Sequence, residues 1–209
     1  MCGKQLHFYA LAVPAAIALL LGSAKAERIA SDNAELEQIY EADQKDRDGS
    51  TSKPAALDWK VIGARDSARR KRVRELIDRG HLNTGKDYAR AAMVFQHGDT
   101  SDDILLAHIL AVTAMGKGCM DARWLAAATL DRFLWRIGQP QVFGTNFSHK
   151  EVAGQPKWTT DPYDRLLVPP TLREANCVPD QKHQSETLEA LSKGEEPKPS
   201  NTCGETRRR

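Results

Sequence analysis

The middle of the chain holds three helical patterns in succession, separated only by short turns that contain glycine. In the first pattern, Tyr88, Ala91, Ala92 and Phe95 recur at i, i+3, i+4 and i+7, which places all four on one face of a helix. Ser101-Asp102-Asp103 then supplies an N-cap and acidic side chains for the first turn of the next helix. Helices joined by such short turns pack as antiparallel neighbours. The sequence therefore predicts an all-α fold built from helical hairpins.

Helical periodicity, with start and stop signals, predicts about five helices in total. Their expected ranges are 30–47, 66–80, 86–98, 101–116 and 120–137. After Pro140 the residues become aromatic and typical of turns, and residues 142–147 can pair with 152–158 as a small β-hairpin. The proline-rich segment 160–179 is expected to lie over the helices as an irregular cover. We therefore expect one helical domain over residues 27–180, which ends in a short irregular or β-hairpin C-terminal cover.

The first 26 residues are typical of a secretory signal peptide. Lys4 forms a short basic region, residues 6–21 are almost all apolar, and Ala24-Lys25-Ala26 is a small-x-small cleavage site. The alternative is a membrane anchor, but the apolar run is short for a bilayer and contains Pro14. We expect cleavage after Ala26 and a periplasmic or secreted protein, with no lipid anchor and no stable membrane insertion after cleavage.

Cleavage would also remove the basic excess of the chain. Loss of Lys4 and Lys25 lowers the 30 basic side chains to 28, a number equal to that of the acidic side chains. A mature chain of zero net charge has no electrostatic basis for general nucleic-acid binding. We therefore expect no nucleic-acid partner.

The C-terminal segment 181–209 has few large apolar residues and many Lys, Glu, Pro and Ser. Such a segment does not offset its ordering entropy, so the sequence predicts a disordered tail. Three cysteines are left after signal cleavage, an odd number for an oxidising compartment. One disulfide and one free thiol is the simplest arrangement. Cys119 with Cys177 is the preferred pair, because Cys203 lies deep in the predicted tail.

Several ionisable residues occupy positions that the helical period turns toward the core. Asp131 and His108 fall on the apolar stripes of their helices, and Asp43, Asp66 and Asp99 extend such stripes by one step. Burying charged groups without partners costs on the order of several kcal/mol, so these side chains must pair, meet water or line a cleft. Two interpretations follow: a buried polar network that fixes helix register, or a polar pocket at one end of the helices.

Three polar strings add hydrogen-bonding groups to these positions: Gln96-His97-Gly98-Asp99, Asp131-Arg132, and the run 139–146. His97 with Asp99, or His108 with Asp131, can form a base that a carboxylate orients. The candidate catalytic residues are His97, Asp99, Asp131 and Arg132. The candidate substrate-binding residues are Asp43, Arg47, Asp66, Gln96, His108, Gln141, Gly144 and Thr145.

Other chemistries lack their sequence signatures. There is no Gly-x-Ser-x-Gly elbow, no His-x-x-x-His or paired-Cys metal spacing, no phosphate loop and no dinucleotide fingerprint. A glycosidase-like carboxylate pair, such as Asp43 with Asp131, is possible but nothing requires it. We therefore expect no metal and no cofactor.

The order of these motifs also carries a family resemblance. The motifs are Asp43-Gln44-x-x-Arg47, Trp59 with Asp66, Gln96-His97-Gly98-Asp99, Asp131-Arg132 and Gln139-Pro140-Gln141-Val142-Phe143-Gly144-Thr145. They resemble the pattern D-Q-x-x-R, Q-H-A-D, D-R and Q-x-Y-G-T-Q of an uncharacterised bacterial family of exported proteins, a domain of unknown function. Gly98, Phe143 and Asn146 depart from that pattern, and the resemblance implies no established activity. The alanine-rich segments 87–95 and 121–129 lie 34 residues apart, which resembles the tetratricopeptide period.

Two functions fit these observations. The first is a helical module that binds another protein of the bacterial envelope, which the alanine-rich helices and the absence of a recognised nucleophile favour. The second is a periplasmic hydrolase-type enzyme that acts on an envelope substrate through His97, Asp99, Asp131 and Arg132. A concave apolar groove would favour the first, and a closed polar pocket that joins His97 to Asp131 would favour the second.

Overall fold

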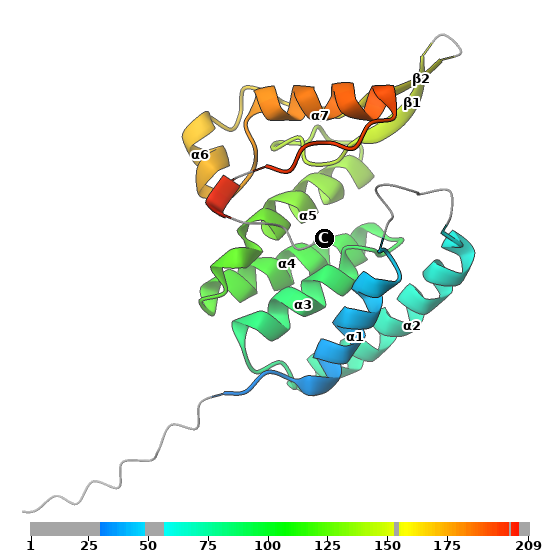
Figure 1. Cartoon of the computed structure of the whole chain (residues 1–209). Helices are drawn as coiled ribbons and strands as arrows, with labels where there is room; N and C mark the ends of the chain where they lie inside the picture. The colour runs from blue at the N-terminus through cyan, green and yellow to red at the C-terminus, as the bar shows by residue number, and fades with distance from the viewer. Residues whose placement is uncertain (1–29, 49–56, 153–154, 201, 205–209) are drawn as a thin grey trace, which may run out of the picture.

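The computed structural model describes residues 30–48, 57–152, 155–200 and 202–204. In this part of the chain it contains seven α-helices and one two-stranded antiparallel sheet (Figure 1). The predicted all-α fold with a small hairpin in its C-terminal cover is confirmed. The predicted signal peptide lies outside the described residues. No described helix is both long enough and apolar enough to cross a membrane.

Five helices form the body of the molecule. They are α1 (Ala34–Lys45), α2 (Trp59–Asp78), α3 (Gly85–Phe95), α4 (Ser101–Gly116) and α5 (Arg123–Arg136), with a short 3-10 helix η2 (Met120–Ala122) before α5. Helix α4 lies between α3 and α5, while α1 and α2 pack against α3 (Figure 1). The shared core combines large side chains from α1 and α2 with many alanines from α3, α4 and α5, which allow these three helices to approach closely. Its buried members include Leu36, Val73, Leu76, Ala91, Ala92, Phe95, Ala107, Ala111 and Ala126.

Helix α2 begins at Trp59, about two turns before the predicted start at Asp66. Asp58 caps it, because its side chain accepts hydrogen bonds from the backbone N–H groups of Lys60 and Val61. Ile62 is 5 % exposed and anchors the added turns to the core. Charged and exposed residues dominate these turns and hide the helical period in the sequence. The longer helix places Trp59, Ile62 and Asp66 on one element.

The C-terminal cover differs from its prediction in two places. The strands are β1 (Ser148–Val152) and β2 (Gln155–Thr159), with Ser148 opposite Thr159, so the expected pairing of 142–147 with 152–158 is wrong. Short helices α6 (Pro170–Ala175) and α7 (Gln181–Lys193) and a 3-10 turn η3 (Thr202–Gly204) complete the cover.

Helix α7 also shows that the predicted disorder of the tail is wrong for residues 181–193. The Asp180 side chain caps this helix by accepting from the backbone N–H of His183 at 2.7 Å. Buried Gln184 donates from Nε2 to the carbonyls of Phe143 and Gly144, at 2.7 and 2.9 Å. Composition missed this helix because a buried amide, and not a stripe of large apolar side chains, holds it in place.

The disulfide joins Cys177 to Cys203, and Cys119 is free. The expected Cys119–Cys177 pair is therefore wrong: α7 turns the tail back over the cover and brings Cys203 to Cys177.

Loss of this disulfide should destabilise the cover. Because the bond closes a loop across 26 residues, Cys203→Ser should lower the unfolding free energy by roughly 3 kcal/mol in urea titrations. Cys119→Ser is the matched control and should change it little. Non-reducing peptide mapping that finds Cys119 in a disulfide would contradict this assignment.

Candidate functional site

Three aspartates, Asp43, Asp87 and Asp131, are 0 % exposed in the described structure, and their partners differ in kind. Asp87, at the start of α3, accepts hydrogen bonds from the backbone N–H groups of Asn33, Asn83 and Thr84 at 2.9, 2.9 and 3.2 Å. It caps its own helix and ties the segment before α1 to α3. Its role is therefore structural.

Asp131 also binds backbone. Its Oδ1 accepts from the N–H groups of Val142 and Phe143 at 2.7 and 2.9 Å, and its Oδ2 accepts from the N–H and the hydroxyl of Thr145 at 2.8 and 2.7 Å. These four bonds use the carboxylate to hold the turn after α5 in one shape. The proposed catalytic role of Asp131 is not supported, because both of its oxygens are occupied by that turn.

The predicted substrate-binding residues Gln141, Gly144 and Thr145 belong to this same turn. Gln141 accepts from the Asn146 N–H at 2.9 Å and donates to the Thr160 carbonyl at 2.5 Å. Gly144 has a φ of +66°, and a Cβ at this position would lie 2.7 Å from the Tyr163 ring. None of the three lines the cleft described below.

His108 is a half-buried histidine between α4 and α5. Its Nδ1 lies 3.0 Å from the carbonyl oxygen of Ala126 and 3.5 Å from the Thr129 hydroxyl. It does not contact Asp131 among the described interactions, so the predicted His108–Asp131 pair is not formed.

Asp43 differs from the other two buried aspartates because side chains surround it. Its Oδ1 accepts from Arg47 Nη1 at 3.0 Å, and its Oδ2 accepts from Gln44 Nε2 at 2.8 Å. The other arm of Arg47 pairs with Asp66 on α2. His97 Nε2 lies 3.5 Å from Asp43 Oδ2. Residues from α1, α2 and the α3–α4 turn thus meet at one point. The sequence motifs predicted that polar residues come together, but not which of them are in contact.

The Asp43–His97 contact joins a carboxylate to a neutral imidazole. Burial, together with Arg47 and Arg132, lowers the pKa of His97 to about 2. Burial raises the pKa of Asp43 to about 6, against the opposing effect of Arg47. The pair is therefore not an ion pair at neutral pH, although the two groups are close enough for one. His97 Nε2 is buried and has no hydrogen-bond partner among the described residues.

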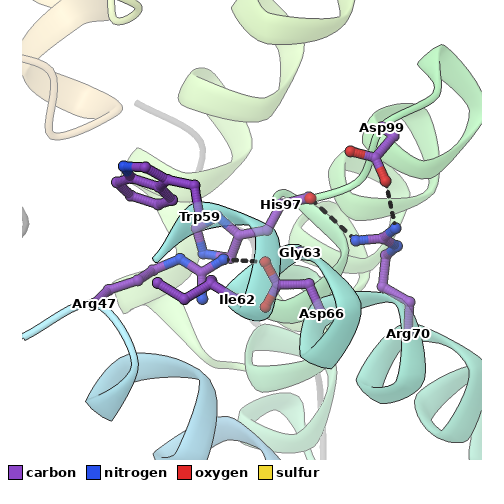
Figure 2. A pocket seen from close by; sticks show the side chains of 8 residues that line it. All are labelled: Arg47, Trp59, Ile62, Gly63, Asp66, Arg70, His97 and Asp99. Atoms are coloured by element: carbon purple, nitrogen blue, oxygen red, sulfur yellow. Dashed lines mark hydrogen bonds and ion pairs between the residues drawn. The ribbon is translucent and has the colours of Figure 1, made fainter. Parts of the chain in front are cut away.

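A cleft of about 420 Å³ opens beside this pair, a volume typical of small-molecule sites. In Figure 2 the Trp59 indole lies on one side of His97, and the paired side chains of Arg70 and Asp99 lie on the other. Arg70 Nη2 donates to Asp99 Oδ2 at 2.8 Å, and the Asp99 side chain is 83 % exposed. The lining residues are Arg47, Trp59, Ile62, Gly63, Asp66, Arg70, His97 and Asp99.

Arginines hold the backbone of residues 96–99, which carries His97 into the cleft. Each of the four successive carbonyls accepts a hydrogen bond from a guanidinium group. Arg132 binds that of Gln96 at 2.7 Å, Arg70 that of His97 at 3.0 Å, and Arg136 those of Gly98 and Asp99 at 3.5 and 2.9 Å. The turn therefore has a fixed shape although it lies between helices.

Gly98 is the one position in this turn that has no room for a side chain. A Cβ there would lie 2.2 Å from Cβ of Asp103. The Ala of the resembling pattern would not fit here without movement of α4.

Four of the predicted site residues therefore meet at the cleft: Arg47, Asp66, His97 and Asp99, with Asp43 buried behind them. Gln96 and Arg132 support His97 from outside the cleft lining. Sequence reasoning missed Trp59, Ile62, Gly63 and Arg70 as lining residues. Arg70 lies four residues after Asp66 and three before Val73, so helical phase alone places it on the inward stripe of α2.

The neutral state of His97 has a measurable consequence for stability. Its folded-state pKa lies below the unfolded value of 6.5, so unfolding takes up a proton as the pH falls below 6.5, and stability is lost. When the pH is lowered from 7.5 to 5, the wild type should lose about 2 kcal/mol more unfolding free energy than His97→Gln does. Urea titrations at the two pH values measure this difference. If the difference in unfolding free energy between the two proteins is the same at both pH values, His97 takes up a proton in the folded state.

No protein-family model matches the chain, and no curated protein and no solved structure matches it.

Proposed function

We propose that the cleft beside His97 binds a small polar molecule and that the protein is an enzyme that transfers a proton to or from it. One observation carries this proposal: a buried imidazole nitrogen without a hydrogen-bond partner among the described residues faces a carboxylate that side chains alone hold. Asp87 and Asp131, by contrast, accept hydrogen bonds mainly from backbone N–H groups. The Asp43–His97 pair therefore contains a hydrogen-bonding group that no described residue satisfies, and it lies at the edge of a cleft.

The roles follow from the contact between the two side chains. In the ligand-free protein His97 Nε2 lies 3.5 Å from Asp43 Oδ2 without a hydrogen bond to it. A hydrogen on Nε2 leaves Nδ1 to accept a proton. The lowered pKa makes His97 a weak base in the ligand-free protein. The ionised Asp43 stabilises the imidazolium that forms when a proton arrives, which is the part that an aspartate plays in catalytic triads.

The lining residues narrow the reaction class. No Ser, Thr or Cys lines the described cleft, so a covalent acyl intermediate has no nucleophile there. Hydrolysis by a water molecule that His97 activates fits the remaining groups, with Arg47 and Asp66 orienting the substrate. Together with the expected export of the chain, this supports an envelope metabolite or a fragment of an envelope polymer as substrate.

A second candidate is the helical protein-binding module, and the surface of α4 favours it. Leu105, Ile109 and Val112 lie at i, i+4 and i+7 and are 36, 52 and 48 % exposed. No Asp, Glu, Lys or Arg occurs between Asp103 and Lys117. Such an apolar stripe is typical of docking faces. The stripe lies outside the cleft lining, so the two functions do not exclude each other.

A ligand screen tests the first candidate. Envelope metabolites and fragments are added to the wild type and to His97→Gln, and thermal unfolding is recorded. A true ligand raises the melting temperature of the wild type and not that of the variant. Compounds that stabilise both proteins equally would place the binding site elsewhere.

A further inference from the structure

We infer that Arg132 is a positioning residue that joins the C-terminal cover to the turn carrying His97, so that the cover sets the orientation of the imidazole. The inference rests on the proposed function only for its catalytic consequence. The coupling itself concerns the ligand-free protein.

The Arg132 side chain reaches both the turn that carries His97 and the C-terminal cover. Nη1 donates to the carbonyl of Gln96 at 2.7 Å, and Nε donates to Oδ1 of Asn146 at 3.1 Å. One planar group therefore contacts the residue next to His97 and a residue of the cover at the same time. Among the described side chains no carboxylate lies within ion-pair distance of Arg132. Burial lowers its pKa, with Arg136 and Arg47 adding to the effect.

Asn146, the contact of Arg132 in the cover, is itself held by hydrogen bonds. The N–H and the side-chain amide of Asn146 donate to Oε1 of Gln141 at 2.9 and 3.3 Å. Gln141 Nε2 in turn donates to the carbonyls of Asn146 and Thr160. Oδ1 of Asn146 is thus held in place from the cover, and Arg132 transmits that position to the turn.

The geometry of the two contacts explains why residue 132 is an arginine. A partly buried cation whose partners are neutral oxygens is an expensive way to gain stability. Arginine, unlike lysine, has a planar guanidinium group that donates along two fixed directions. Both directions are in use, one toward the turn and one toward the cover.

The test uses the full chain with its disulfide intact and ¹⁵N-labelled histidine, without ligand. The nitrogen resonances of the His97 ring report its tautomer and surroundings. Asn146→Ala removes the far contact without touching the cleft lining, and Arg132→Lys removes one arm of the fork. Ser148→Ala is the matched control, because Ser148 lies in the cover and binds the Thr159 carbonyl and not Arg132.

We expect Asn146→Ala and Arg132→Lys to move the His97 resonances in the same direction, and the double variant to move them no further than Arg132→Lys alone. Ser148→Ala should leave them in place. Unchanged His97 resonances in a folded Asn146→Ala variant would overturn the inference, whether or not a ligand is ever found for the cleft.

Discussion

Replacement of Asp131 by asparagine is expected to lower the unfolding free energy by about 3 to 5 kcal/mol, the largest loss among the single polar variants. The amide has one acceptor oxygen where the carboxylate has two, so it can keep only one of the two pairs of bonds to the turn. The amide nitrogen of the asparagine would then face the donors of the other pair, and these donors would lose their acceptor in a buried contact. Urea titrations at pH 7 measure this loss.

The matched control is Thr145→Val, which removes only the hydroxyl bond to Asp131 and should cost about 1 kcal/mol. If Asp131→Asn were as stable as the wild type, the turn would not depend on this carboxylate. Asp131 would then have to be reconsidered as a residue that acts on a ligand.

His97→Gln should reduce ligand binding or turnover at least about 100-fold once a ligand is known, while the protein stays folded at pH 7. The reason is that glutamine fills the site but cannot accept a proton. The wild-type activity should itself rise with pH through about 6, because Asp43 must lose its proton before it can stabilise the imidazolium.

His108→Gln is the control for this experiment, since His108 lies between α4 and α5 and does not line the cleft. It should keep both binding and the pH profile. Equal losses in the two histidine variants would indicate a general effect on the fold. A bound protein partner that His97→Gln does not affect would support the helical docking module instead.

Helical period placed the buried carboxylates correctly. Asp43, Asp66 and Asp131 were expected to face inward, and they are 0, 5 and 0 % exposed. The period cannot tell which partner an inward carboxylate finds. The partners of Asp131 come from the turn after its own helix, whereas His97, which lies near Asp43, comes from the turn before α4. That distinction separates a structural residue from a candidate site residue, and it depends on tertiary structure.

The wrong predictions from the sequence have related causes. Asp99 was expected to extend an inward stripe just past the end of its helix, but its side chain is exposed. Helix α7 was missed because Gln184 holds it through two backbone carbonyls, a contact that a count of apolar residues does not register. The contacts by which arginines hold residues 96–99 were also not predicted, because these arginines come from α2 and α5.

The most direct test of the central claim compares the same chemical change in two buried carboxylates, Asp43→Asn and Asp131→Asn, by urea unfolding at pH 8. The folded-state pKa of Asp43 is raised above its unfolded value of 3.8. Its contribution to stability is therefore fully present below pH 3.8 and is lost as the pH rises through about 6.

A neutral asparagine removes that loss, while Arg47 keeps Asp66 as its partner. Asp43→Asn should thus be as stable as the wild type or more stable, by up to about 3 kcal/mol, while Asp131→Asn loses stability. A loss at Asp43 as large as that at Asp131 would show that both carboxylates serve the fold and that the cleft beside His97 is not a functional site.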